Sequence, residues 1–247
     1  MNMSDMDFIR NNVTLYIVTV PAGAGGSFLG YLQRFYLGHH LKIIDEKNFP
    51  HLNKWDPAYG MFDIKDIPIV LTGQPGITEL FINYKGKDKQ DIINNDTNRL
   101  TNSIKKMMVW QTWLTDDKVL LPCHVFPHDF AIDFRLIFKY VEHTLAITGD
   151  LDTIKYVSQL KSVKCPKWMD GNKESVEEKA EDVYKNQQLA SPLTSIDYKK
   201  FFIDVDKDEI KKFFTSTIDI NEFNNDKLEP ICDMIKIYTK LNKELIA

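Results

Sequence analysis

Residues 15–38, which read LYIVTVPAGAGGSFLGYLQRFYLG, carry the clearest indication of the fold. It begins inside an apolar run, residues 13–20, that is rich in β-branched side chains. Such a run is typical of a strand buried on both faces of a parallel sheet. A Gly-rich loop, residues 21–26, follows, and residues 27–36 then place apolar side chains at helical spacing. A strand, a glycine turn and a helix in this order predict the opening of a βαβ unit.

The Gly-rich loop has the composition of an anion-binding turn. Gly23, Gly25 and Gly26 allow the backbone to curl around a ligand without Cβ clashes, and the start of a helix offers N–H groups and a favourable dipole. Ser27 adds a hydroxyl and is expected to be the helix N-cap. The loop lacks the lysine of the Walker pattern, and Phe28 stands where the dinucleotide pattern has its third glycine. The loop is therefore either an anion site or only a tight turn.

The rest of the chain alternates between strand and helix patterns, which predicts an α/β fold with a largely parallel sheet. The expected strands are residues 67–73, 78–84, 118–126 and 143–148, with residues 195–203 as a last strand or extended segment. The expected helices are residues 99–114, 134–141, 149–164 (after a turn), 206–214 and a C-terminal helix near 226–245. The charge-dense segment near 165–190 is expected to be an exposed helix or a mobile lid. We expect one domain over residues 1–247.

Composition narrows the class of protein. The chain has 43% hydrophobic residues, a net charge of -4 and a pI of about 5.9, which argues against a generic nucleic-acid binder. Its three cysteines show no CxxC pairing, so neither a disulfide framework nor a zinc knuckle is indicated. The sequence contains no signal-peptide pattern and no apolar run long enough to span a membrane. We therefore expect a cytoplasmic protein without a nucleic-acid or membrane partner.

Three pieces of the sequence together resemble the sulfotransferase family, whose members transfer a sulfuryl group from 3′-phosphoadenosine 5′-phosphosulfate. The first piece is the opening strand and loop, in which Pro21 begins the turn and Gly25–Phe28 end it. The second is LPCHVFP, residues 121–127, which is similar to the family's strand ending in Lys-Thr-His. The third is SIDYKKFFIDVDKDEIKKFF, residues 195–214, which resembles the family's Tyr-Glu-Asp-Leu segment and the helix after it. The resemblance implies a three-layer P-loop-type fold, a mainly parallel sheet flanked by helices.

The resemblance also implies roles for individual residues. His124 matches the catalytic base that deprotonates the acceptor, a small molecule or glycan. Ser158 matches the serine that holds the 3′-phosphate. The remaining implied ligands of 3′-phosphoadenosine 5′-phosphosulfate are Gly23, Gly25, Gly26, Ser27 and Phe28, and the family needs no metal ion.

The sequence departs from the family at its cations. Ala22 replaces the loop lysine, Pro122 replaces the lysine of the second motif, and Asp150 stands where the next strand would end in arginine. Another cation, such as Lys155 or Lys42, must then stabilise the bridging oxygen, or activity is weak or absent.

Several residues keep two interpretations. His124 suits a general base because imidazole titrates near neutrality, but it is equally a strand-end histidine bonded to backbone. His124 and His128 have a metal spacing that Pro127 interrupts. Asp150 and Asp152 bind a metal or cap the following helix. Lysines on that helix either meet an anion or form a solvated face: Lys155, Lys161 and Lys164.

Two other functions remain open. One is a P-loop nucleotide-binding or kinase-like protein, which would bind ATP with Mg²⁺. The other is a non-catalytic descendant of the fold that acts in binding or structure.

Overall fold

A computed structural model describes residues 11–21, 23–38, 112–115, 118–123, 138–164, 175–189, 194–218 and 220–246 of the protein. Its helices and strands are, in chain order, β1 (Thr14–Thr19), α2 (Gly26–Tyr36), β2 (Thr112–Thr115), β3 (Lys118–Cys123), β4 (Tyr140–Thr148), α6 (Leu151–Lys164), α7 (Val176–Leu189), β5 (Ser195–Asp197), the π-helical turn η4 (Lys199–Ile203), α8 (Lys207–Thr217), the 3₁₀ turn η5 (Asn225–Lys227) and α9 (Leu228–Ile246).

The strands form a five-stranded sheet in the order β2-β3-β1-β4-β5. β1 pairs in parallel with β3 on one side and with β4 on the other, and β4 pairs in parallel with β5. Only the pairing of β2 with β3 is antiparallel within this sheet. Every residue from Leu15 to Thr19 is buried, as a central parallel strand requires. The predicted α/β class with a mainly parallel sheet is therefore confirmed.

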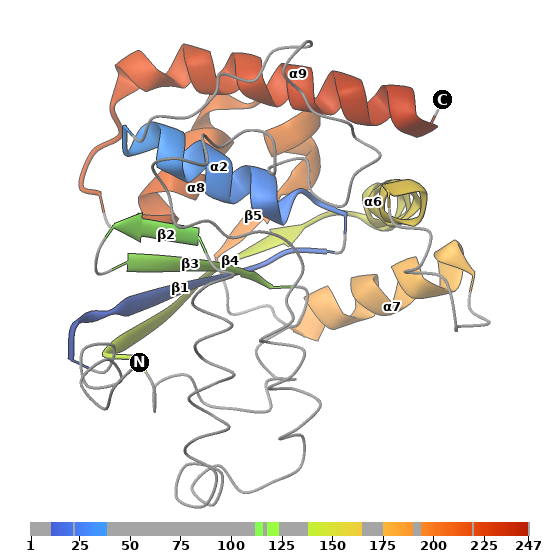
Figure 1. The fold of residues 1–247 in the computed structure, drawn as a ribbon. Helices are drawn as coiled ribbons and strands as arrows, with labels where there is room; N and C mark the ends of the chain where they lie inside the picture. The colour runs from blue at the N-terminus through green and yellow to red at the C-terminus, as the bar shows by residue number, and fades with distance from the viewer. Residues whose placement is uncertain are drawn as a thin grey trace, which may run out of the picture.

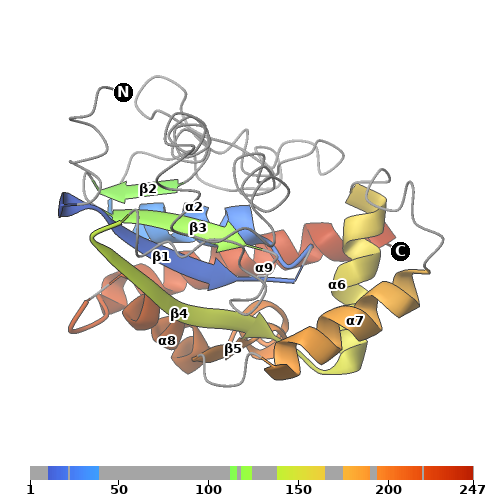
Figure 2. The ribbon, with the colours of Figure 1, turned by 90° about the horizontal axis from the view of Figure 1, so that it is seen from below.

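The described helices lie on one face of the sheet and at one end of it. α2, α8 and α9 lie over one face, with α9 outermost (Figure 1). α6 and α7 lie beyond the ends toward which β1, β3 and β4 point, in both views (Figures 1 and 2). α9 joins the core through Tyr238, whose ring stacks on Phe28 of α2 at 4.1 Å between centroids. Phe202 of η4 packs against both rings, so aromatic contacts join α2, η4 and α9.

Short polar contacts fix where the helices begin. The Asp150 carboxylate accepts a 2.7 Å hydrogen bond from the Thr153 N–H and caps α6, which confirms the capping interpretation of this residue. Ser175 and Glu178 form a capping box before α7, and Asp206 caps α8. The predicted N-cap of α2 is wrong: Gly25 is the N-cap and Ser27 lies inside the first turn. A left-handed glycine fits this tight entry, with φ of 83°.

Three expected elements differ from the structure. Thr112–Thr115 form an edge strand on β3 rather than the end of a helix, because short apolar runs suit either period. Phe138 and Lys139 form a bend and Tyr140–Thr148 a strand, so the helix expected at residues 134–141 is wrong over these described positions; pairing with β1 decides the conformation there. Strand β5 ends at Asp197, and η4 then turns so that the neighbouring rings of Phe201 and Phe202 are both buried. A strand would place them on opposite faces.

Other expectations fall partly or wholly on residues that the structure does not describe. The strands expected at residues 67–73 and 78–84 lie outside the described residues. Within the polar segment 165–190, the described part is the helix α7, which is the exposed-helix alternative. The expected C-terminal helix is α9.

Candidate functional site

The Gly-rich loop, residues 21–26, leaves the sheet at the point where its strand order reverses. In the sheet, β3 lies on one side of β1 and the next strand along the chain, β4, lies on the opposite side of β1. The last pairs of the β1 ladders join Thr19 with Cys123 and with Ala146. All three strands therefore end at one edge. Ligands of open α/β sheets bind outside the carboxyl ends of the strands at such a switch point.

The geometry of the loop directs backbone N–H groups outward from the start of α2. The Ala24 N–H donates to the Pro21 carbonyl at 2.9 Å, which closes a turn. Gly23 and Gly25 have φ of 98° and 83°. The carbonyl of Gly25 accepts the first helical bond, from Leu29. The N–H groups of Gly26, Ser27 and Phe28 precede that bond, so they have no partner within the helix. No side chain of the described residues caps this end of α2, which leaves the positive end of the helix dipole for an anion.

Helix α6 lies against the outer side of this loop. A Cβ built on Gly23 would lie 2.4 Å from the carbonyl oxygen of Val157 and 3.0 Å from Cβ of Lys161. Ser158 shares this side of α6, because residues three and four apart are neighbours on a helix, and it is 2% exposed. The structure therefore brings the loop glycines and Ser158 to one place. Lys161 is half-buried beside the loop, and its contact with an anion stays a prediction.

Helix α9 lies against the loop from another direction. A Cβ on Gly25 would lie 2.7 Å from the Tyr238 hydroxyl oxygen. Phe28 is fully buried, with its ring stacked on the Tyr238 ring, so its side chain belongs to the core. Gly23 and Gly25 are therefore needed for the close packing of α6 and α9 against the loop, whether or not an anion binds there. Sequence reasoning missed Tyr238 as a loop neighbour, since its only signal was membership of the apolar stripe of α9.

The end of β4 is held by a second contact that the sequence did not reveal. The Gln187 side chain of α7 accepts a hydrogen bond from the Gly149 N–H at 3.3 Å and donates one to the Gly149 carbonyl at 2.5 Å. Gln187 is buried. The next residue, Asp150, caps α6, and the hydrogen bonds from Thr153 lower the pKa of its carboxyl group. This edge therefore carries a fixed negative charge close to the start of α6.

A group of buried phenols lies behind the loop, between α6, η4 and α9. Burial raises the pKa of Tyr198 well above its ordinary value, and the phenols of Tyr238 and Tyr156 raise it further. Burial also raises the pKa of Tyr156. The phenols of Tyr198 and Tyr156 therefore stay protonated at neutral pH. The Tyr156 hydroxyl and both polar side-chain atoms of Asn242 are buried without a hydrogen-bond partner among the described residues.

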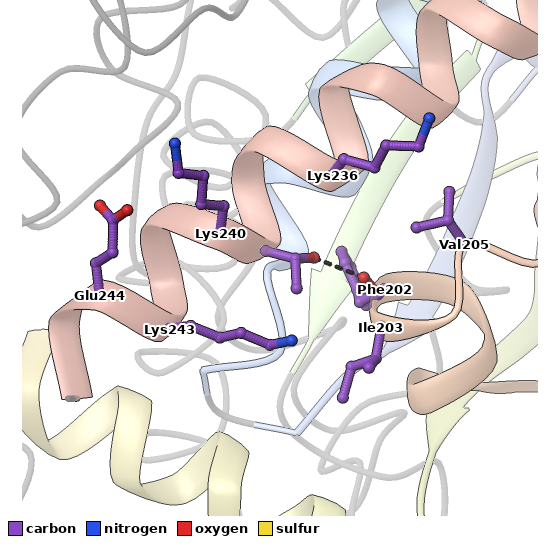
Figure 3. Close-up of a pocket in the computed structure, with 8 residues that line it drawn as sticks. Phe202, Ile203, Val205, Lys236, Lys240, Lys243 and Glu244 are labelled. Carbon is purple, nitrogen blue, oxygen red and sulfur yellow. Dashed lines mark hydrogen bonds between the residues drawn. The ribbon is translucent and has the colours of Figure 1, made fainter.

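A shallow groove of about 370 Å³ runs between α9 and η4. Its apolar side is formed by Ile203 and Val205, and Figure 3 shows the Lys243 ammonium group pointing across it while Lys240 points away. Lys236 on its rim lies 2.8 Å from the Asp233 carboxylate. The charge of Lys236 is therefore already compensated, and this groove is a weaker candidate for an anionic ligand than the Gly-rich loop.

The predicted base, His124, lies outside the described residues, as does Lys42. Cys123, the residue before His124, is the last of β3 and pairs with Thr19. Among the described residues, no three His, Cys, Asp or Glu side chains are arranged to hold a metal ion. None of the described helices is long and apolar enough to cross a membrane.

No protein-family model matches the sequence, and neither the curated proteins nor the solved structures contain a match to the chain.

Proposed function

We propose that the protein is a sulfotransferase-like transferase of the three-layer P-loop type. It would transfer a sulfuryl group from 3′-phosphoadenosine 5′-phosphosulfate to a hydroxyl or amine of a small molecule or glycan. The observation that carries the proposal is the Gly-rich loop. It joins the central parallel strand to the uncapped N-terminus of α2 at the switch point of the sheet.

The residues around the loop fit an anionic nucleotide. Amides at the start of α2 (Gly26, Ser27 and Phe28) would hold the 5′-phosphosulfate, because they follow the left-handed N-cap Gly25 and have no partner within the helix. Ser158 lies on the side of α6 that meets the loop and would serve the 3′-phosphate. When bound, the nucleotide supplies the activated sulfuryl group.

His124 would act on the acceptor. It follows Cys123, which ends β3 beside the last residue of β1. In the proposed reaction its imidazole takes the proton of the acceptor hydroxyl or amine as that atom bonds to sulfur. The amides of α2 stabilise the negative charge on the departing oxygen.

Binding of three ligands separates this function from its rivals. We would measure thermal unfolding with 3′-phosphoadenosine 5′-phosphate, with ATP and Mg²⁺, and with sulfate. A ligand at one hundred times its Kd stabilises the native state by about 2.7 kcal/mol. The proposal expects this from the bisphosphate. Stabilisation by ATP with Mg²⁺ alone would favour a kinase-like protein, and no response to any of the three would favour a non-catalytic protein.

The role of His124 has its own test. His124→Ala is expected to abolish sulfuryl transfer and to leave binding of 3′-phosphoadenosine 5′-phosphate unchanged, because the histidine acts on the acceptor. Transfer at the wild-type rate by this variant would remove His124 from the mechanism.

A further inference from the structure

We propose that Lys161 of α6 supplies the positive charge for a phosphate or sulfate group bound at the Gly-rich loop, in place of the lysine that the loop lacks. This inference rests on the proposed function and adds to it a binding residue from a different part of the chain. The group that Lys161 would bind is a phosphate or a sulfate.

The first line of support is the closeness of Lys161 to the loop. A Cβ on Gly23 would lie 3.0 Å from Cβ and 3.2 Å from the backbone N of Lys161. The lysine side chain therefore begins at the loop, and its flexible stem lets the ammonium group reach an anion there. Among the described residues Lys161 forms no salt bridge, so none of them compensates its charge.

The second line of support is an unpartnered polar side chain on α9. Asn242 is 1% exposed, and both of its polar atoms lack a hydrogen-bond partner among the residues described. It lies one helical turn after Tyr238, on the same side of α9, and the Tyr238 hydroxyl lies against Gly25. α6 also contacts α9. The stem of Lys161 therefore begins beside the loop, and Asn242 offers an unused amide on the side of α9 that carries Tyr238; an unsatisfied buried group points to a partner.

Lys155, another lysine of α6 considered for this role, is less well placed. The α6 atoms nearest to a Cβ on Gly23 belong to Val157 and Lys161, and Lys155 lies more than one helical turn before Lys161. Lys155 is therefore a matched control: it lies on the same helix and carries the same charge.

The main experiment compares two charge-neutralising variants. Titration calorimetry would measure the affinity of wild type, Lys161→Gln and Lys155→Gln for pyrophosphate, for sulfate and for 3′-phosphoadenosine 5′-phosphate. We expect Lys161→Gln to weaken binding about tenfold, Lys155→Gln to change it less than twofold, and Lys161→Arg to restore most of the affinity. The pyrophosphate and sulfate arms distinguish a phosphate site from a sulfate site.

The outcomes separate the two proposals. If wild type binds and Lys161→Gln binds equally well, the role of Lys161 is overturned while the proposed function stands. If wild type binds none of the three ligands, the proposed function fails, and the role of Lys161 fails with it.

A labelling experiment on the unmodified protein does not depend on how the variants fold. The phosphate of pyridoxal 5′-phosphate would dock at the loop, and its aldehyde would condense with a nearby lysine amine, releasing water. Borohydride then reduces the imine to a stable amine that mass spectrometry locates. We expect labelling of Lys161 that pyrophosphate suppresses. Labelling that spares Lys161, or that pyrophosphate does not affect, would overturn the proposal.

Discussion

The close approach of α6 to the Gly-rich loop predicts a large cost for one added methyl group. In Gly23→Ala, the new Cβ would lie 2.4 Å from the Val157 carbonyl oxygen. That atom is helix backbone and cannot rotate away, so the loop and α6 must separate. Overpacking of this kind costs about 1–3 kcal/mol. The backbone φ of 98° adds about 1–2 kcal/mol for an L-residue with a side chain.

A second glycine provides the matched control. Gly38 follows α2 with a φ of 85°, and among the described residues a Cβ there would meet only the Lys227 Nζ atom, at 4.0 Å. Gly38→Ala therefore carries the conformational cost without the clash. Replacing glycine also restricts the unfolded chain, which returns about 0.4–1 kcal/mol in both variants. We expect a net loss of about 1 kcal/mol for Gly38→Ala and about 2–4 kcal/mol for Gly23→Ala.

Urea denaturation monitored by tryptophan fluorescence and far-UV circular dichroism measures both losses. The midpoint should fall for both variants while the slope m stays the same. The difference between the two free energies of unfolding isolates the contact between Gly23 and α6. Equal losses in the two variants would refute the packing of α6 against the loop, and with it the position assigned to Lys161.

Three other substitutions test further contacts. Gln187→Ala should lower the free energy of unfolding by about 1–3 kcal/mol, because both backbone groups of Gly149 lose their buried partner. Chemical denaturation measures this loss, and an unchanged midpoint would contradict the contact between Gln187 and Gly149. Asp150→Ala should cost about 1 kcal/mol at neutral pH as the cap of α6 is lost. Since the pKa of Asp150 is lowered in the folded protein, the stabilisation by its carboxylate is present above the ordinary carboxyl pKa and is lost as pH falls through the folded pKa. The denaturation curves of wild type and Asp150→Ala should therefore converge in acid. A stability difference that stays constant with pH would argue against a titrating cap. Asn242→Leu should raise the free energy of unfolding by about 1–2 kcal/mol, because two buried polar atoms without partners are removed; a less stable variant would mean that Asn242 has a partner in the native state.

The parts of the fold that sequence predicts well are those encoded locally. The β-branched run of β1, the glycine turn and the apolar stripe of α2 follow one another within residues 14–36, so their periodicities are readable. The cap of α6 was equally readable, because Asp150 and the N–H that it binds are three residues apart.

The parts that sequence did not predict depend on contacts between distant segments. Nothing near Gly23 indicates that Lys161 lies against it, and nothing near Gly149 indicates Gln187. The π-helical turn at Phe201 and Phe202 arises because both rings are buried in one aromatic core, which strand-like periodicity does not anticipate. The N-cap of α2 was misassigned because serine is the commoner cap, whereas the entry into this helix uses a left-handed glycine.

The proposed function requires that the Gly-rich loop binds the anionic part of a nucleotide. The most direct measurement is a titration of the ¹⁵N-labelled protein with 3′-phosphoadenosine 5′-phosphate, followed through the backbone amide resonances. We predict saturable shifts that are largest at Gly25, Gly26 and Phe28, with smaller shifts along the Val157–Lys161 side of α6. If binding saturates without a shift of these amide resonances, or if the shifts are confined to the groove beside Lys243, the Gly-rich loop is not the nucleotide site.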